Sequence, residues 1–327
     1  MLGFSSIPLW GLLVFLLTIP QSALCTSTTV STIFQFPNIG SWIEGIAVRE
    51  NGDILITRTD TPELWSINPL TKQASLLYTF PNATSTVGIT ELSPGIYAVG
   101  AGIVDLATTV ATAGSFVIWT VDLRFLTPRA SVLKAIPEGQ SLSGMTLYEG
   151  GGPPLLLIAD TKKGAVWRLD PRTGAYSVAL SDSSMLPVEG LPPIGINGIK
   201  VSGRTLYYTS STKQVFCRVA LNTDGSAAGP IEVVASGFFQ DGLALKPDGT
   251  AYITTHPRNT VLKVTPSGET SVFVGNLNST AVAGSTDAQF GFYWGQEVLY
   301  VTTNGALSAP VNGTFTEPAK VVMVTMC

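Results

Sequence analysis

Short apolar strands alternate with polar turns along most of the chain, and the alternation forms a repeat. Each unit begins with a small or polar residue followed in most copies by glycine, then an alternating strand, a turn and two further apolar strands. The clearest units begin at Glu44-Gly45, Asn197-Gly198 and Asp241-Gly242, and weaker ones begin at Val87-Gly88, Ser143-Gly144 and Thr280-Ala281. A spacing of about 40 to 55 residues is typical of one four-stranded propeller blade.

The turns and the two ends of the repeat support the same fold. Asn51-Gly52 and Asp248-Gly249 are strong two-residue hairpin turns, because both central positions tolerate positive φ. Residues 30–36 and 321–326 are strand-like segments before the first unit and after the sixth, and in a propeller such segments pair within one blade. The sequence therefore predicts an all-β six-bladed β-propeller with four-stranded blades, closed by pairing of its N- and C-terminal strands.

The first 25 residues differ from the rest of the chain. Residues 7–19 are apolar and are broken by Pro8, and small residues follow before Cys25. This run is short for a membrane span, which needs about 20 residues, and is typical of a secretory signal peptide. We predict a signal peptide over residues 1–25 and one propeller domain over residues 26–327. An uncleaved anchor is the alternative.

Other features indicate the secretory pathway, with a secreted or vesicular location. Asn82, Asn278 and Asn312 begin glycosylation sequons. Cleavage near residue 25 leaves Cys217 and Cys327, which form either a disulfide tying the last strand to the fourth blade or two buried thiols.

The charge content narrows the classes of function. Only 12% of the residues are charged, the net charge is −4 and there is no basic run, so we expect no nucleic-acid partner. No later stretch is long and apolar enough to span a membrane, so no membrane partner is expected after signal cleavage. The Gly-x-Ser-x-Gly and zinc-ligand spacings are absent, and the glycines at 150–152 lack the Lys-Ser/Thr of a phosphate loop.

Candidate site residues come from the blade starts. In a propeller the innermost strands line the central channel, so the residues before the repeated glycines form a ring near one mouth. That ring comprises Glu44, Val87, Ser143, Asn197, Asp241 and Thr280. Two carboxylates and an amide suit Ca²⁺ or Mg²⁺. The alternative is that Glu44 and Asp241 bond backbone amides at strand starts.

Two further groups of residues have two interpretations each. His256, the one histidine, is either an acid–base residue or a loop residue that holds the turn at Arg258-Asn259. Several aromatic residues lie near blade starts or loops, where they either wall a pocket or pack between blades: Trp42, Trp65, Phe239, Phe290, Tyr293 and Trp294.

The blade starts Glu44-Gly45, Asn197-Gly198 and Asp241-Gly242 resemble the metal-binding starts of gluconolactonase and senescence-marker-protein-like propellers. The resemblance implies that Glu44, Asn197 and Asp241 hold a divalent cation that polarises a lactone carbonyl and activates water, with Asp241 also acting as a base. Two features depart from the family: Ile46 stands where proline is usual, and a further polar partner, commonly asparagine, is replaced by Ser143 or by nothing.

Three segments, residues 44–52, 255–259 and 299–305, are similar to a fungal secreted branch of these propellers. The resemblance implies natural-product biosynthesis by a hetero-Diels–Alderase, which joins a tropolone-type quinone methide to an apolar terpene such as humulene. Orientation alone can supply about 7–11 kcal/mol for such a reaction, and hydrogen-bond donors at the heterodiene oxygen add to it.

The expected partners are therefore small apolar natural products, and no cofactor is required. Candidate catalytic residues are Glu44, Ser143, Asn197, Asp241 and His256. A lactonase that uses Ca²⁺ or Mg²⁺ and a non-catalytic ligand-binding propeller are the alternatives.

Overall fold

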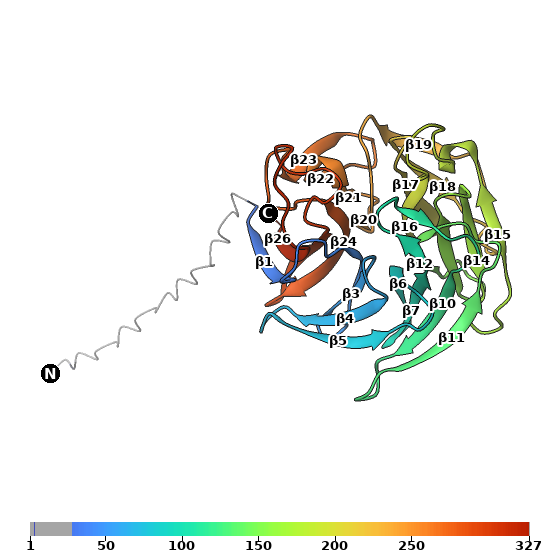
Figure 1. Cartoon of the computed structure of the whole chain (residues 1–327), viewed down its shortest axis with the longest axis horizontal. Coiled ribbons are helices and arrows are strands. Elements are labelled where there is room, and N and C mark those ends of the chain that lie inside the picture. The colour runs from blue at the N-terminus through green and yellow to red at the C-terminus, as the bar shows by residue number, and fades with distance from the viewer. Residues whose placement is uncertain (1–2, 4–27, 327) are drawn as a thin grey trace.

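The computed structural model describes Gly3 and residues 28–326, and it forms a closed ring of six four-stranded antiparallel sheets (Figure 1). The predicted six-bladed propeller is confirmed. The signal peptide predicted over residues 1–25 lies outside the described residues apart from Gly3. Cys327 also lies outside them, and so does the possible disulfide between Cys217 and Cys327. Cys217 is buried in the fourth blade.

The strands follow one another around the ring in chain order. The first blade comprises β2 (Ile43–Val48), β3 (Ile54–Arg58), β4 (Glu63–Asn68) and β5 (Gln73–Thr79). The second comprises β6 (Ser85–Ser93), β7 (Ile96–Gly102), β10 (Val117–Asp122) and β11 (Arg129–Ala135). The third comprises β12 (Leu142–Tyr148), β13 (Leu155–Asp160), β14 (Ala165–Leu169) and β15 (Tyr176–Ser181).

The second half of the ring repeats this plan. The fourth blade comprises β16 (Ile196–Ser202), β17 (Thr205–Ser210), β18 (Val215–Ala220) and β19 (Glu232–Ser236). The fifth comprises β20 (Leu243–Leu245), β21 (Ala251–Thr254), β22 (Thr260–Val264) and β23 (Thr270–Gly275). Short additions are the hairpin of β8 (Val104–Asp105) and β9 (Val110–Ala111) and the 3-10 turns η1 (Ser183–Met185) and η2 (His256–Arg258).

The sixth blade joins the two ends of the described chain. Its strands are β24 (Ser285–Tyr293), β25 (Gln296–Thr303), β26 (Lys320–Thr325) and β1 (Val30–Gln35). β1 pairs antiparallel with β26, with Val30 opposite Val324 and Gln35 opposite Lys320. The predicted closure by terminal strands is confirmed, and it pairs an edge that would otherwise be open.

The repeated glycines allow the innermost strands to approach one another at the axis. A Cβ atom added to Gly88 would lie 2.3 Å from the carbonyl oxygen of Ser143, and one added to Gly144 would lie 2.7 Å from that of Asn197. No side chain fits at such distances, so glycine is required by close backbone approach rather than by its freedom of φ. The repeat in the sequence is therefore a packing signal.

The prediction that the sixth unit of the repeat begins at Thr280 is wrong. The innermost strand of the sixth blade begins at Ser285, and its register break lies between Ser285 and Ala288, as the first blade's lies between Ile43 and Ile46. Thr286 therefore occupies the ring position, and Asp287 stands where the other blades have glycine. The pattern failed there because a carboxylate replaces the residue that marks the other five units.

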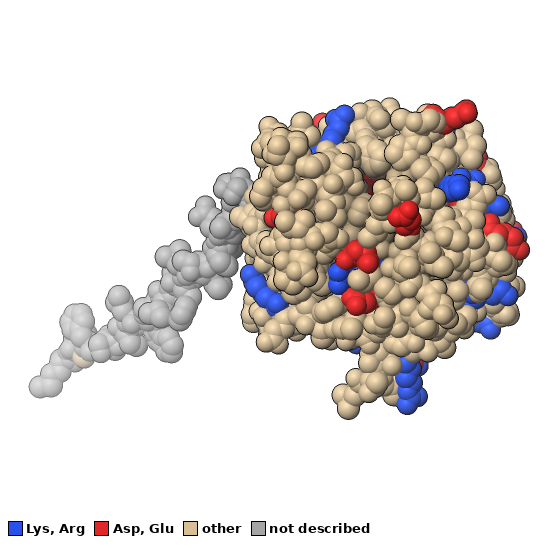
Figure 2. All heavy atoms as spheres, in the orientation of Figure 1, with Lys and Arg blue, Asp and Glu red and all other residues tan. Residues whose placement is uncertain are grey.

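Large apolar side chains fill the space between neighbouring sheets. One buried cluster between the third and fourth blades includes Tyr148, Leu157, Ile199 and Tyr208, all of them almost fully shielded from solvent. Most of the molecular face shown in Figure 2 is uncharged. Within the described residues there is no helix whose length and hydrophobicity would allow it to cross a bilayer.

Candidate functional site

A cavity of about 410 Å³ lies at one mouth of the central channel. Polar groups from the blade starts and from η2 line part of it: Glu44, Ser143, Asn197, Asp241 and His256. Apolar side chains from several connections line the rest, among them Val104, Leu106, Pro192, Ile194 and Phe239. A volume in the range of about 300–1,000 Å³ with few convergent polar groups is typical of small-molecule sites.

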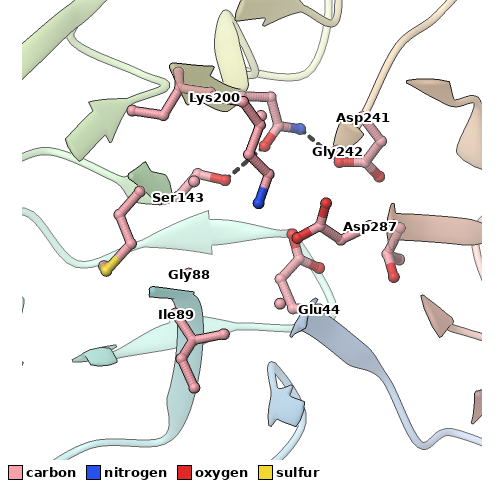
Figure 3. A pocket seen from close by; sticks show the side chains of 15 residues that line it. Glu44, Gly88, Ile89, Ser143, Lys200, Asp241, Gly242 and Asp287 are labelled. Carbon is pink, nitrogen blue, oxygen red and sulfur yellow. Dashed lines mark hydrogen bonds between the residues drawn. The ribbon is translucent and has the colours of Figure 1, made fainter. Parts of the chain in front are cut away.

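The channel itself is narrow where the glycines meet. Its free space is about 20 Å³, which is room for about one water molecule. Lys200 of the fourth blade and Asp287 of the sixth line it (Figure 3). A substrate therefore has room in the cavity above the ring and not in the channel below it.

A hydrogen-bonded chain connects three of the predicted ring residues. Ser143 donates from Oγ to Oδ1 of Asn197 at 2.5 Å, and Asn197 donates from Nδ2 to Oδ1 of Asp241 at 2.7 Å. These residues come from the third, fourth and fifth blades, so the structure brings together side chains that are distant in the chain. Asn197 and Asp241 are buried.

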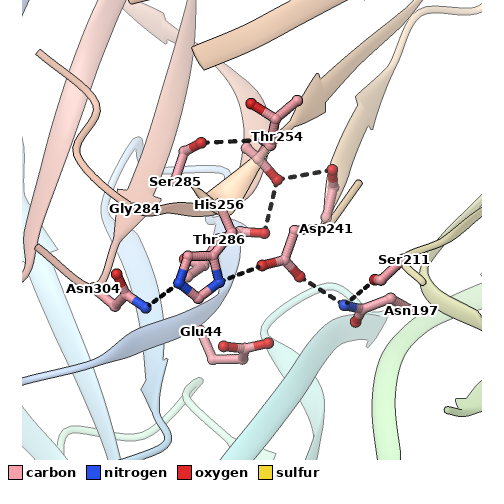
Figure 4. Close-up of polar contacts among 12 residues, drawn as sticks. Glu44, Asn197, Ser211, Asp241, Thr254, His256, Gly284, Ser285, Thr286 and Asn304 are labelled. Carbon is pink, nitrogen blue, oxygen red and sulfur yellow. Dashed lines mark hydrogen bonds and ion pairs between the residues drawn. The ribbon is translucent and has the colours of Figure 1, made fainter. Parts of the chain in front are cut away.

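His256 joins this chain from η2 (Figure 4). Its Nδ1 lies 3.4 Å from Oδ2 of Asp241, and its Nε2 lies 2.8 Å from Nδ2 of Asn304. The backbone N–H of Ala306 donates to Oδ1 of Asn304 at 3.0 Å, so the amide must offer its NH₂ group to the imidazole. We infer that Nε2 accepts and that Nδ1 carries the proton. The imidazole lines the cavity, while the His256 backbone forms the turn.

Glu44 faces the cavity and is held by a tryptophan. Trp42 donates from Nε1 to Oε2 of Glu44 at 2.7 Å, and the Trp42 ring meets the His256 imidazole edge to face, with centroids 5.4 Å apart. Burial, and then the nearby Asp241 carboxyl, raise the pKa of Glu44 to about 8. Burial also lowers the pKa of His256 to about 4. Near neutral pH, Glu44 is therefore mostly protonated and His256 is uncharged.

Asp241 and Asp287 are two further carboxyl groups near the axis. Burial, and then the charge of Asp287, raise the pKa of Asp241 well above its ordinary value. Burial also raises the pKa of Asp287, whereas Lys200 opposes the shift. The N–H of Ala288 donates to Oδ1 of Asp287 at 2.8 Å. Of these groups, only Asp287 has a cation nearby, so it is the best placed to carry negative charge.

The residues expected to hold a divalent cation do not fit one in this arrangement. Both carboxylate oxygens of Asp241 face N–H donors, from Asn197 and His256, and Oε2 of Glu44 accepts from Trp42. Asn197 turns its NH₂ group, not its oxygen, toward Asp241. Across the described part of the chain, no group of three or more His, Cys, Asp or Glu side chains is arranged to bind a metal.

The aromatic residues divide between the site and the core. Trp42 and Phe239 line the cavity. Trp65 packs edge to face on Phe36, with centroids 5.4 Å apart, and Phe290 packs on Tyr252 at 5.4 Å. The remaining two, Tyr293 and Trp294, lie beside each other, and Trp294 is 78% exposed.

Sequence reasoning missed the residues that support the site from the sixth blade. Asn304 belongs to a segment that was noticed for its resemblance, but nothing in the sequence indicated that it contacts His256. Asp287 was missed because the units of the repeat were identified by their glycine, which Asp287 replaces. The absence of glycine from the sixth unit is the signal that indicates this position.

Comparison with solved structures gives the class of fold. The luciferin-regenerating enzyme superposes with a TM-score of 0.64 at 14% identity, covering 92% of this chain and 96% of that protein. A gluconolactonase from Xanthomonas campestris superposes with a TM-score of 0.61 at 12% identity, covering 92% and 90%. The chain thus has the fold of the gluconolactonase-like six-bladed propellers.

Comparison with curated sequences points to a narrower group. A protein from Phoma sp named "Putative hetero-Diels-Alderase" is 27% identical over 307 residues, covering 83% of this chain and 86% of that protein. A second, from Sarocladium schorii and named "Putative hetero-Diels-Alderase asR5", is 26% identical over 314 residues, covering 83% and 77%. No family model matches the chain. The resemblance drawn from the blade starts and short segments is confirmed by these relatives.

Proposed function

We propose that this chain is a secretory-pathway enzyme of natural-product biosynthesis that catalyses an intermolecular hetero-Diels–Alder reaction. The observation that carries the proposal is the cavity of about 410 Å³, which combines largely apolar walls with the protonated carboxyl group of Glu44. The names of the two sequence relatives support the reaction class. The substrates we propose are a tropolone-type quinone methide as the heterodiene and an apolar terpene alkene such as humulene.

In this mechanism the cavity holds the two partners face to face. One C–C bond and one C–O bond form together as the alkene adds across the heterodiene, and no atom leaves. Glu44 donates a hydrogen bond to the heterodiene oxygen, which gains negative charge as the bonds form. A donor in a site shielded from water stabilises that charge more than it would in bulk solvent. No cofactor takes part.

The other polar residues keep the acid in place, and burial keeps it in its protonated form. Trp42 fixes one oxygen of Glu44, which leaves the second oxygen free to carry the proton toward the cavity. His256 and Asn197 hold the nearby Asp241 carboxyl by its two oxygens. Ser143 orients Asn197. Orientation of both substrates supplies the larger part of the acceleration.

The test is turnover with a quinone methide generated in solution and humulene as the alkene. We expect wild-type protein to give one stereoisomer, above the background rate and unaffected by a chelator. Glu44→Leu should lower the rate by about 100-fold, the order of magnitude of losing one oxyanion donor, while Glu44→Gln keeps an N–H donor and loses less. Glu149→Leu alters an exposed glutamate and should leave the rate unchanged.

Two other outcomes would replace the proposal. Hydrolysis of lactones that disappears with chelator and with Asp241→Asn would indicate a gluconolactonase-like enzyme using Ca²⁺ or Mg²⁺ at Glu44, Asn197 and Asp241. Tight binding of the substrates without product above background would indicate a non-catalytic ligand-binding propeller.

A further inference from the structure

The second blade carries an insertion on the cavity side. In this blade the connection between the second and third strands, β7 and β10, spans residues 103–116 and contains the β8–β9 hairpin. The corresponding connections are residues 59–62 in the first blade, 161–164 in the third and 211–214 in the fourth. The insertion therefore adds a structural element where those blades have only a tight turn.

The hairpin is held in a defined position. The hydroxyl of Thr84 accepts from the N–H of Val104 at 3.0 Å and donates to the carbonyl of Val104 at 3.2 Å. Asp105 caps the tip by accepting from the N–H of Ala107 and from the hydroxyl of Thr108, both at 2.9 Å. Val104 also packs against the buried core of the second and third blades. The cavity wall that the hairpin forms is thus part of the folded structure.

The cavity lining includes a group of aliphatic side chains. Val104 and Leu106 from the hairpin line the cavity together with Val87, Leu142, Pro192 and Ile194, and the uncharged hydroxyl residues Thr109, Ser141 and Thr161 also line it. The carboxyl groups, the imidazole and the Trp42 indole lie on the strands and turns of the first, fifth and neighbouring blades. An oxygenated ring gains hydrogen bonds beside the carboxyl groups and the imidazole, whereas a hydrocarbon has no hydrogen bonds to lose beside the aliphatic side chains.

We propose that Val104 and Leu106, with Leu142 and Ile194, form the subsite that binds the aliphatic hydrocarbon partner, so that the β8–β9 hairpin sets the size of hydrocarbon accepted. The inference rests on the proposed function for the reaction and on the geometry of the cavity for binding. Apolar surface removed from water is the source of affinity in such a subsite, at about 25 cal/mol per Å².

Binding of a saturated ring hydrocarbon tests the subsite without any reaction. Cyclodecane uptake by the full chain is measured by headspace partition. We expect wild-type protein to bind it, Leu106→Ala to bind it roughly tenfold more weakly, and Leu106→Trp to exclude it by filling the space. Val110→Ala changes an exposed residue of the same hairpin that does not line the cavity, and should bind as wild type. Unchanged melting temperatures show that the variants fold.

Steady-state kinetics then distinguish a role of Leu106 in binding the terpene from a purely structural role. Leu106→Ala should raise KM for the terpene while leaving KM for the quinone methide unchanged. Cyclodecane binding that is absent in wild type, or equal in Leu106→Ala and wild type, would overturn the subsite. Cyclodecane binding that depends on Leu106 in a protein without cycloaddition activity would uphold the subsite and reject the proposed reaction, so the two failures are distinguishable.

Discussion

Asn304, which follows β25 in the sixth blade, donates from its Nδ2 to Nε2 of His256 in the fifth blade across 2.8 Å. This contact joins two neighbouring blades directly above the ring of blade starts. Because Ala306 fixes the direction of the amide, Asn304 determines which nitrogen of His256 carries the proton. The imidazole N–H is thereby directed at Asp241, and the site's polar network depends on a residue outside the ring.

Replacing Asn304 should release the His256 tautomer. Asn304→Asp keeps an acceptor for the Ala306 N–H but removes the donor to Nε2, whereas Asn304→Leu removes both. We expect each to allow the Nε2-protonated form and to lower turnover by roughly tenfold, the size of one lost hydrogen bond of about 1–2 kcal/mol. Nitrogen-15 NMR of the single histidine measures the tautomer directly. An unchanged imidazole spectrum in Asn304→Asp would contradict the assignment.

The proposed acid makes turnover depend on pH. Glu44 must be protonated to donate, and its pKa is raised to about 8, so the rate should be constant near neutral pH and fall as the pH rises through about 8. The glutamine in Glu44→Gln cannot ionise, so this variant should keep part of the rate and show no decrease in rate as the pH rises through about 8. A wild-type rate that increases through the same range would show that the carboxylate is the active form.

The same pKa shifts predict how stability depends on pH. Between about pH 4.5 and 8 the folded state keeps a proton on Glu44 that the unfolded chain has released, so this group lowers the free energy of unfolding as pH rises. His256 acts in the opposite sense between about pH 4 and 6.5, where only the unfolded chain is protonated at this residue, so the two contributions oppose each other below pH 6.5.

Urea denaturation at a series of pH values measures both trends. The slope from one group is at most about 1.4 kcal/mol per pH unit. Glu44→Gln should remove its contribution above pH 6.5, and His256→Gln should leave the falling contribution of Glu44 unopposed below pH 6.5. A Glu44→Gln variant with the wild-type slope between pH 6.5 and 8 would show that this carboxyl is already ionised there.

The close approach at the axis predicts a strong contrast between two glycines. Gly88→Ala would place a methyl group 2.3 Å from a backbone oxygen and should lower the free energy of unfolding by about 3 kcal/mol. Gly229→Ala lies on the surface with no atom within 4 Å and should leave stability unchanged or raise it by a few tenths of a kcal/mol. Similar denaturation midpoints for the two variants would contradict the packing argument.

Passage through the secretory pathway should modify the chain. The sequon residues Asn82, Asn278 and Asn312 all have exposed side chains, as glycan attachment requires. We expect the protein secreted from a fungal host to lose mass on treatment with peptide N-glycosidase. Each Asn→Gln variant should remove one step of that loss. Secreted protein with no glycan on any of the three would contradict this prediction.

The sequence by itself determined the architecture of this protein. Alternating strands, hairpin turns and a glycine near the start of five of the six innermost strands are local consequences of pleating and close packing, so the number of blades and the terminal closure could be predicted from them. The same pattern placed Glu44, Ser143, Asn197 and Asp241 in one ring. Each of these depends on the backbone path, which the repeat encodes.

Only the tertiary structure decided which groups those side chains contact. The orientation of the His256 imidazole toward Asp241 depends on Asn304, which lies in another blade and shows no local signal. The unsuitability of Asp241 for a cation follows from the N–H groups that face it. Asp287 could not be found from the repeat, because it stands where the other blades have glycine. Such contacts join residues far apart in the chain, and their energies depend on burial, which no short stretch of sequence specifies.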